Sequence, residues 1–499
     1  MTSSSRSSSK DAPAEGAHGA RRILRRLKAD VGGTLFVSVI ALFLLLTLPV
    51  LIKGAPIGDD YWACVRHTEV GLSGALHEAF VDTGVVRPVR YLEVLVVGSL
   101  CRHVPFGVLM LVPLGLTLTV AFQVRGLLRD LGAARPWPEV GASLWLLAPL
   151  AAESALWASA LHVPLGLAFA LASLRMYRRD RWGFGGALAL MAFLSLEQTI
   201  FAMPVAAFLV TPTRRMRSLL TCGAIALGVL ICFATWPGEN VRTAVSLSER
   251  LTGVFQDPIW YVKLPVAGLG VHSIPLAVWW ALPYSVAILA LGGWLGLRFG
   301  RALPEGAVSP AHSGNESALR VVGAAALLGL LINLPQMTTV PRGVSGRIFA
   351  PTWLLLSVTL PLIAQRTRIP RIPAVWLGAG VFAAGALLST SLCVSVLVHT
   401  ADFSKASSEY MAARLPRPNE LVALCGIQRT VVSPAPVGSV AGHTLYYDWS
   451  AHAALEYYTG KSAAFRLGGP LFGTRCPNLS GADLVVHFQQ LRAATGLDR

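Results

Sequence analysis

The chain has 499 residues, of which 54% are hydrophobic and only 14% are charged. Its mean hydropathy of +0.58 is typical of a polytopic membrane protein and sets the chain apart from soluble globular proteins. The formal net charge is +16. Because the basic residues are mostly arginines in short runs between apolar segments, they indicate membrane topology and not a surface that binds nucleic acid.

Residues 1–30 are rich in Ser, Ala and Gly and end in a basic run, RRILRRLK at Arg21–Lys28. This composition predicts a disordered, basic cytoplasmic tail. The apolar segment Val31–Ile52 follows, and it is long enough to cross a hydrocarbon core of about 30 Å. Since basic flanks stay in the cytoplasm, we expect the N-terminus inside and the far end of this helix outside.

Arginine clusters fall in every second loop between the apolar segments that follow. Placing all of these clusters inside predicts a polytopic α-helical membrane protein with about eleven transmembrane helices. The clusters are Arg125, Arg129 and Arg135; Arg175, Arg178, Arg179 and Arg181; Arg214, Arg215 and Arg217; Arg298, Arg301 and Arg320; and Arg366, Arg368 and Arg371. The transmembrane domain would cover residues 31–398, with a long first outer loop at residues 54–103.

Residues 399–499 are of mixed polarity and predict a small extracytoplasmic α/β domain. In its segment Tyr446–Gly460, YYDWSAHAALEYYTG, we expect an aromatic-rich helix whose rings pack in the core, with stacking on sugar as the alternative. Cys425 and Cys476 both fall in this domain, where an oxidising compartment favours a disulfide between them. Cys64 is an alternative partner, and we interpret the other four cysteines as small apolar residues in or near membrane helices.

Two adjacent carboxylates, Asp59 and Asp60, lie in the sequence GDDY just after the first apolar segment, on the predicted outer side. Carboxylates so close to lipid are costly, which favours a functional role. They are our candidate catalytic residues. Asp59 suits a general base because the like charge of Asp60 favours proton uptake, and Asp60 would be its partner or a metal ligand. The structural alternative is that the pair starts a helix, where Asp caps well and suits the helix dipole.

These features together resemble the membrane-embedded GT-C glycosyltransferases. The shared features are a first membrane helix, an acidic pair that opens the first outer loop, an interfacial helix at Arg87–Pro105 and further helices with short loops. The resemblance implies an inverting sugar transferase of the bacterial inner membrane. Its donor would be a polyprenyl-phosphate-linked sugar held among membrane lipids, and its acceptor an extracytoplasmic glycan, lipid or protein. No cofactor is implied, although a divalent metal is compatible with this chemistry.

Five further residues on the predicted outer side are candidates for substrate binding. Glu197 lies in a short turn that we expect near the outer membrane surface, where an acid either lines a polar cavity or sits in a plain surface turn. Arg342 and Arg347 lie in a Gly-containing outer loop and suit bidentate phosphate binding, with lipid-headgroup anchoring as the alternative. His162 and Lys263 are weaker candidates for contact with phosphate or acceptor.

Two other functions stay open on the sequence. A transporter or lipid flippase would have charged residues in the middle of membrane helices and repeated halves, whereas the charges of this chain concentrate at helix ends. A non-catalytic component of envelope polysaccharide assembly would leave the Asp pair without a role.

Overall fold

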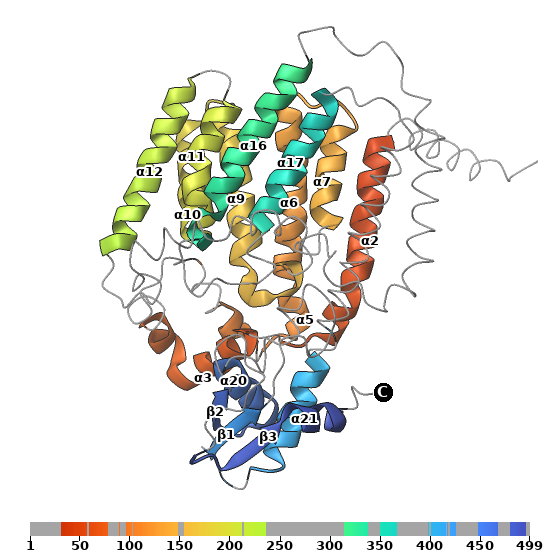
Figure 1. Cartoon of the computed structure of the whole chain (residues 1–499), viewed down its shortest axis with the longest axis vertical. Helices are drawn as coiled ribbons and strands as arrows, with labels where there is room; N and C mark the ends of the chain where they lie inside the picture. The colour runs from red at the N-terminus through yellow and green to blue at the C-terminus, as the bar shows by residue number, and fades with distance from the viewer. Residues whose placement is uncertain are drawn as a thin grey trace, which may run out of the picture.

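A computed structural model shows a mostly helical chain, with a helical bundle above a small α/β domain (Figure 1). The structure describes residues 31–56, 59–77, 96–101, 103–147, 154–211, 214–235, 314–337, 350–366, 401–415, 420–425, 448–467 and 480–495, and the single positions 89, 398 and 417. The arrangement of these parts is enough to locate the predicted acid pair.

Four helices in the described part of the chain are long and apolar enough to cross a membrane: Gly32–Lys53, Phe106–Asp130, Ala158–Arg178 and Arg215–Phe233. They indicate a membrane protein. The first of them, α2 (Val31–Lys53), has 23 residues, and at about 1.5 Å per residue it exceeds the ~30 Å of a hydrocarbon core. The count of about eleven helices stays a prediction, because residues 236–313 and 367–397 lie outside the described residues.

The bundle is built from helices that pack mostly on their neighbours along the chain. Their bounds are α5 Phe106–Leu109, α6 Leu111–Asp130, α7 Trp137–Leu147, η2 Ala158–Ala160, α9 His162–Arg178, α10 Trp182–Ser195, α11 Gln198–Val210, α12 Arg215–Thr235, α16 Gly314–Met337 and α17 Ala350–Arg366. α9 packs on α6 and α10, α11 packs on α12 and α16, and α7 packs on α2 and α17. One continuous apolar core, which includes the fully buried Trp145 and Tyr177, joins these helices.

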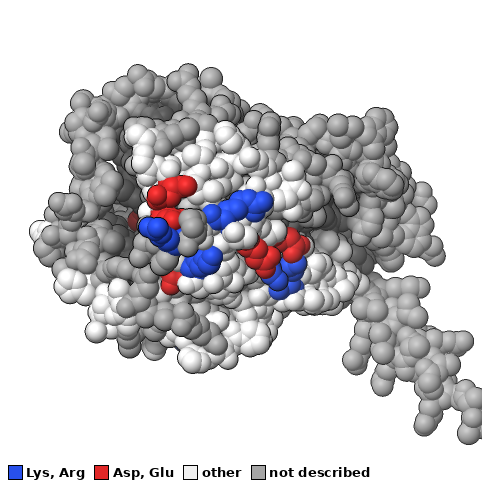
Figure 2. Space-filling view, turned by 90° about the horizontal axis from the view of Figure 1, so that it is seen from below, with Lys and Arg blue, Asp and Glu red and all other residues white. Residues whose placement is uncertain are grey.

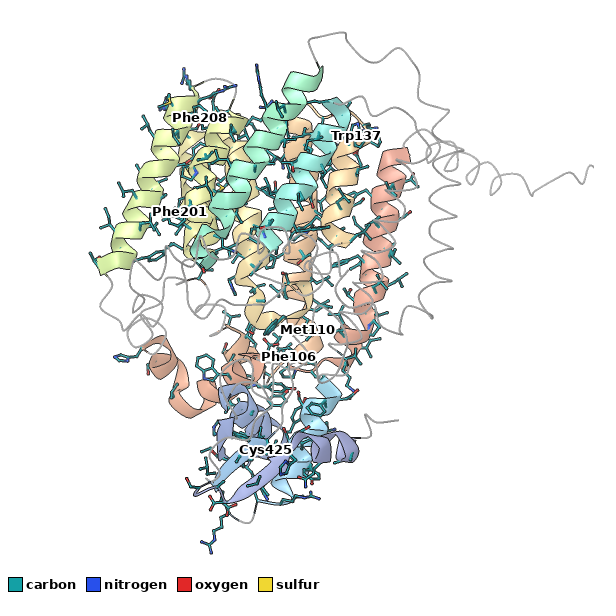
Figure 3. The ribbon with its side chains drawn as sticks, in the orientation of Figure 1. Phe106, Met110, Trp137, Phe201, Phe208 and Cys425 are labelled. Carbon is teal, nitrogen blue, oxygen red and sulfur yellow. A yellow bond between two sulfur atoms is a disulfide. The ribbon has the colours of Figure 1, made fainter. Side chains whose placement is uncertain are left out.

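The predicted arginine clusters in the described bundle gather at one end, which we call the Val31 end; the opposite end is the Lys53 end. Trp137 and Phe208 mark the Val31 end in Figure 3, and Phe106 and Met110 mark the other. At the Val31 end, Arg125 and Arg129 share the carboxylate of Glu139, with N–O distances of 3.0 and 2.5 Å. A neighbouring ion pair joins Arg175 to Asp130 at 2.7 Å. Acidic side chains therefore neutralise part of this basic end.

Replacement of Glu139 with Leu is expected to destabilise the bundle by roughly 1–3 kcal/mol, because two charged hydrogen bonds are lost. The carboxylate of Glu139 is fully buried, whereas the Arg129 side chain is 41% exposed. Water can therefore hydrate the guanidinium group of Arg129 after Glu139 is replaced. The measurement is thermal unfolding of the detergent-solubilised protein. Glu409→Ala is the control, since the Lys405–Glu409 pair is exposed on both sides and contributes almost nothing. Equal stability of the two variants would contradict a structural role for Glu139.

The α/β domain has a three-stranded parallel sheet in the order β2-β1-β3. Its elements are β1 Glu420–Cys425, β2 Ala463–Leu467, β3 Leu484–His487, α20 Asp448–Thr459, α21 Phe488–Thr495 and a helix at residues 401–412. β1 reads ELVALC, an apolar run expected of a central parallel strand covered on both faces. α20 connects β1 to β2 and packs against β2, as a parallel crossover requires.

The structure corrects two predictions about cysteine. Cys64 is bonded to Cys101, with Cα atoms 5.9 Å apart. Cys64 is therefore no alternative partner for the α/β domain, and Cys101 is not simply a small apolar residue. The physical reason is that both lie within the predicted first outer loop, residues 54–103, and so would share one compartment. Cys425 is also disulfide-bonded, but Cys476 lies outside the described residues, so that pairing stays a prediction.

Candidate functional site

The helix α3 (Asp59–His77) contains the acid pair and lies between the bundle and the α/β domain (Figure 1). It begins at Asp59, so both acidic residues belong to its first turn, where negative charge suits the helix dipole. This is the helix start that the structural alternative predicts. Gly71 has φ 67° and ψ 177°, a conformation that suits glycine, and it breaks α3 into two parts.

Asp60 ties α3 to the bundle. Its side chain is fully buried, and its Oδ1 accepts a hydrogen bond from the backbone N–H of Ser159 at 2.7 Å. Ser159 belongs to η2, the tight turn before α9, so the bond joins segments 99 residues apart. A carboxylate that accepts a backbone N–H makes one of the stronger kinds of hydrogen bond. Asp60 is thus the anchoring member of the pair; the side chain of Asp59 lies outside the described part.

The turn that contains Glu197 packs against the start of α9, where His162 is the first residue. Both side chains are buried, with exposed fractions of 8% and 2%. Gly166, one helical turn after His162, allows this approach: a Cβ atom there would lie 2.7 Å from the Cβ of Leu196. The structure therefore brings the Glu197 turn close to the helix that follows the Asp60-binding turn.

Glu197 lies deeper in the bundle than we expected. α10 and α11, which flank it, have 14 and 13 residues. At 1.5 Å per residue they rise only about 20 Å, less than the ~30 Å of a hydrocarbon core. Ser195, Gln198 and Thr199 beside it are buried as well. A buried polar turn at this depth does not fit a plain surface turn and fits an acid that is paired or lines a polar space.

The α/β domain contacts α3 directly through an aromatic cluster. The hydroxyl of Tyr61, which is fully buried, hydrogen-bonds the hydroxyl of Tyr458 in α20 at 2.9 Å. The ring of Tyr61 packs edge-on against Tyr457, with centroids 5.5 Å apart. Burial raises the pKa of Tyr458 to about 12 and that of Tyr61 well above its ordinary value, so both stay protonated at neutral pH. Tyr458 therefore packs against α3, outside its own domain. The sequence instead predicts that the aromatic rings of this segment pack in the core of the α/β domain.

A second contact joins the two parts of the molecule at the Lys53 end. Lys53, the last residue of α2, forms an ion pair with Asp402 of the helix at residues 401–412. Figure 2 views this end of the molecule and shows basic and acidic side chains interspersed over the described surface. Among the described residues on this surface, neither sign of charge dominates.

Three of the predicted binding residues, Arg342, Arg347 and Lys263, lie outside the described residues. Within the described part, no group of three or more His, Cys, Asp or Glu side chains is arranged to hold a metal ion, and the role of Asp60 as a metal ligand stays a prediction. Sequence reasoning did not find Ser159 or Tyr458. Their contacts with α3 span 99 and 397 residues, and no local pattern reveals them.

No known protein family matches the chain, and no curated protein matches it either. The function is therefore inferred from the site itself.

Proposed function

We propose that this protein is an inner-membrane glycosyltransferase of the GT-C kind, which moves a sugar from a polyprenyl-phosphate donor to an extracytoplasmic acceptor with inversion. One observation carries the proposal: an acid pair opens a helix held between a membrane bundle and an α/β domain. Asp60 is anchored to the bundle through Ser159, and Tyr61 is anchored to the domain through Tyr458. A general base acts efficiently only when it is held at a fixed position relative to the acceptor hydroxyl, and these two contacts fix the helix that contains the pair.

In this proposal Asp59 takes the proton of the acceptor hydroxyl while the acceptor oxygen forms its bond to the anomeric carbon of the sugar. The bond from that carbon to the donor phosphate breaks, and polyprenyl phosphate leaves with the electron pair. Arg342 and Arg347 would neutralise the charge on the leaving phosphate through bidentate hydrogen bonds. Asp60 holds the helix start against η2. No step requires a metal. Whether Asp60 ligates a metal ion that takes part is tested below with a chelator.

The depth of the Glu197 turn supports a substrate that is anchored in lipid. A polyprenyl chain lies in the hydrocarbon core, and its phosphate lies close to the membrane surface. A buried polar turn inside the bundle, beside the start of α9, would therefore line the path between lipid and Asp59. The same observation favours a transporter or lipid flippase as the second candidate, because buried acids at membrane depth also serve ion-coupled transport.

We infer a topology with the N-terminus inside and the C-terminus outside. The arginine clusters of the described bundle share the Val31 end, and basic loops stay in the cytoplasm. A reporter enzyme that is active only outside the cytoplasm should give signal when fused after Arg499. The same reporter fused after Arg217 should stay silent. The opposite pattern would contradict both the topology and the outer site.

The test of the function uses membranes that contain the protein and a panel of polyprenyl-phosphate sugars with labelled sugar. We expect transfer of label to an acceptor, with release of polyprenyl phosphate, from at least one donor. A parallel sample with a metal chelator reports whether a divalent metal takes part. Movement of intact labelled donor between the two leaflets of sealed vesicles, with no transfer, would favour the flippase and reject the transferase.

A further inference from the structure

Two successive residues of α3 are held by two different parts of the molecule. Asp60 bonds the backbone of η2 in the bundle, while Tyr61 bonds Tyr458 in the α/β domain. Successive side chains on an α-helix point about 100° apart, so the two bonds restrain the first turn from different directions. Asp59 is the residue next to this doubly restrained point.

The contact with the domain includes polar bonds as well as apolar packing. Tyr61 is fully buried, and Ser404 of the helix at residues 401–412 also hydrogen-bonds its side chain. Beside it, Val65 packs against Ala453 and Ala454 of α20, where small side chains let the two helices approach closely. Buried hydroxyls are costly to leave without a partner, so these bonds favour one docked orientation over others with similar apolar contact.

We propose that the α/β domain positions the acid pair, and that Tyr61 and Tyr458 are positioning residues whose hydroxyl–hydroxyl bond holds the first turn of α3, and with it the backbone of Asp59, in one orientation. The domain then acts on the reaction without touching the sugar. Its part in transfer rests on the proposed function, whereas its effect on the orientation of residue 59 does not. A displacement of a reacting group by about 1 Å is enough to slow a reaction substantially.

The activity test compares Tyr458→Phe, Tyr61→Phe and the double variant, each of which keeps the ring and loses a hydroxyl. The control is Tyr457→Phe, because the Tyr457 hydroxyl makes no hydrogen bond within the described part of the chain. We expect kcat for sugar transfer to fall about tenfold in Tyr458→Phe, with KM for the donor unchanged and with normal protein amount. The double variant should lose about as much as Tyr61→Phe alone, because both changes break the same bond. Additive losses, or equal rates in Tyr458→Phe and Tyr457→Phe, would overturn the proposal for transfer.

A second measurement reports on position without using activity. A spin label is attached to Asp59→Cys in a chain whose Cys222, Cys232 and Cys393 are replaced by Ala. We expect an immobilised label in this protein, a mobile component after Tyr458→Phe, and no change after Tyr457→Phe. An identical spectrum with and without the Tyr458 hydroxyl would overturn the positioning role. If Asp59→Asn keeps full activity, the proposed function fails, and the spectra still decide whether the domain orients this residue.

Discussion

Asp59→Asn is expected to lower the rate of sugar transfer by a factor of about 10²–10⁴, the usual effect of removing a general base. Asn keeps the size of Asp and caps a helix nearly as well, so the start of α3 at this residue should survive the change. The substitution therefore separates catalysis from capping. The measurement is product formed per unit of protein in membranes, with the donor that gives transfer in the wild-type protein.

Asp60→Asn is the matched variant for this experiment. An Asn side chain at position 60 retains an oxygen that can accept the Ser159 N–H, so α3 should stay attached to η2. We expect a smaller loss than for Asp59→Asn. Wild-type rates in both variants would mean that the pair is a helix start and nothing more, and the transferase proposal would lose its main support.

Replacement of Cys64 and Cys101 together by Ala is expected to destabilise the protein by roughly 2–4 kcal/mol, the typical contribution of a disulfide. The bridge joins α3 to the segment before α5 and closes a stretch of 37 residues, so the unfolded chain gains freedom when it is removed. The measurement is thermal unfolding in detergent without reductant. Cys232→Ala is the control, because Cys232 is free and exposed. Recovery of Cys64 and Cys101 as free thiols from native membranes would contradict the bridge.

The sequence was sufficient for features that depend on local composition. The first membrane helix follows from an apolar run with basic residues before it, and the structure ends it at Lys53, one residue from the expected Ile52. The arginines of the described bundle could be assigned to one end because basic loops stay on one side of a membrane. Neither inference requires knowledge of how distant segments pack.

The contacts of the site could not be predicted in the same way. The bonds of Asp60 to Ser159 and of Tyr61 to Tyr458 join helices whose approach depends on packing across the whole molecule. The depth of Glu197 follows from helix lengths that end at Ser195 and begin at Gln198. The Cys64–Cys101 bridge did have a signal, because both residues lie within the predicted first outer loop. The apolar residues before Cys101 instead favoured its interpretation as a small apolar residue.

The most direct test of a role for Asp59 in sugar transfer is the profile of lipid-linked saccharides in a deletion strain. Three strains are compared: the deletion alone, the deletion with the wild-type gene and the deletion with Asp59→Asn at matched protein amount. The transferase account predicts that one polyprenyl-phosphate sugar accumulates in the deletion, returns to its normal amount with the wild-type gene and stays accumulated with Asp59→Asn. A normal profile in the Asp59→Asn strain would contradict it.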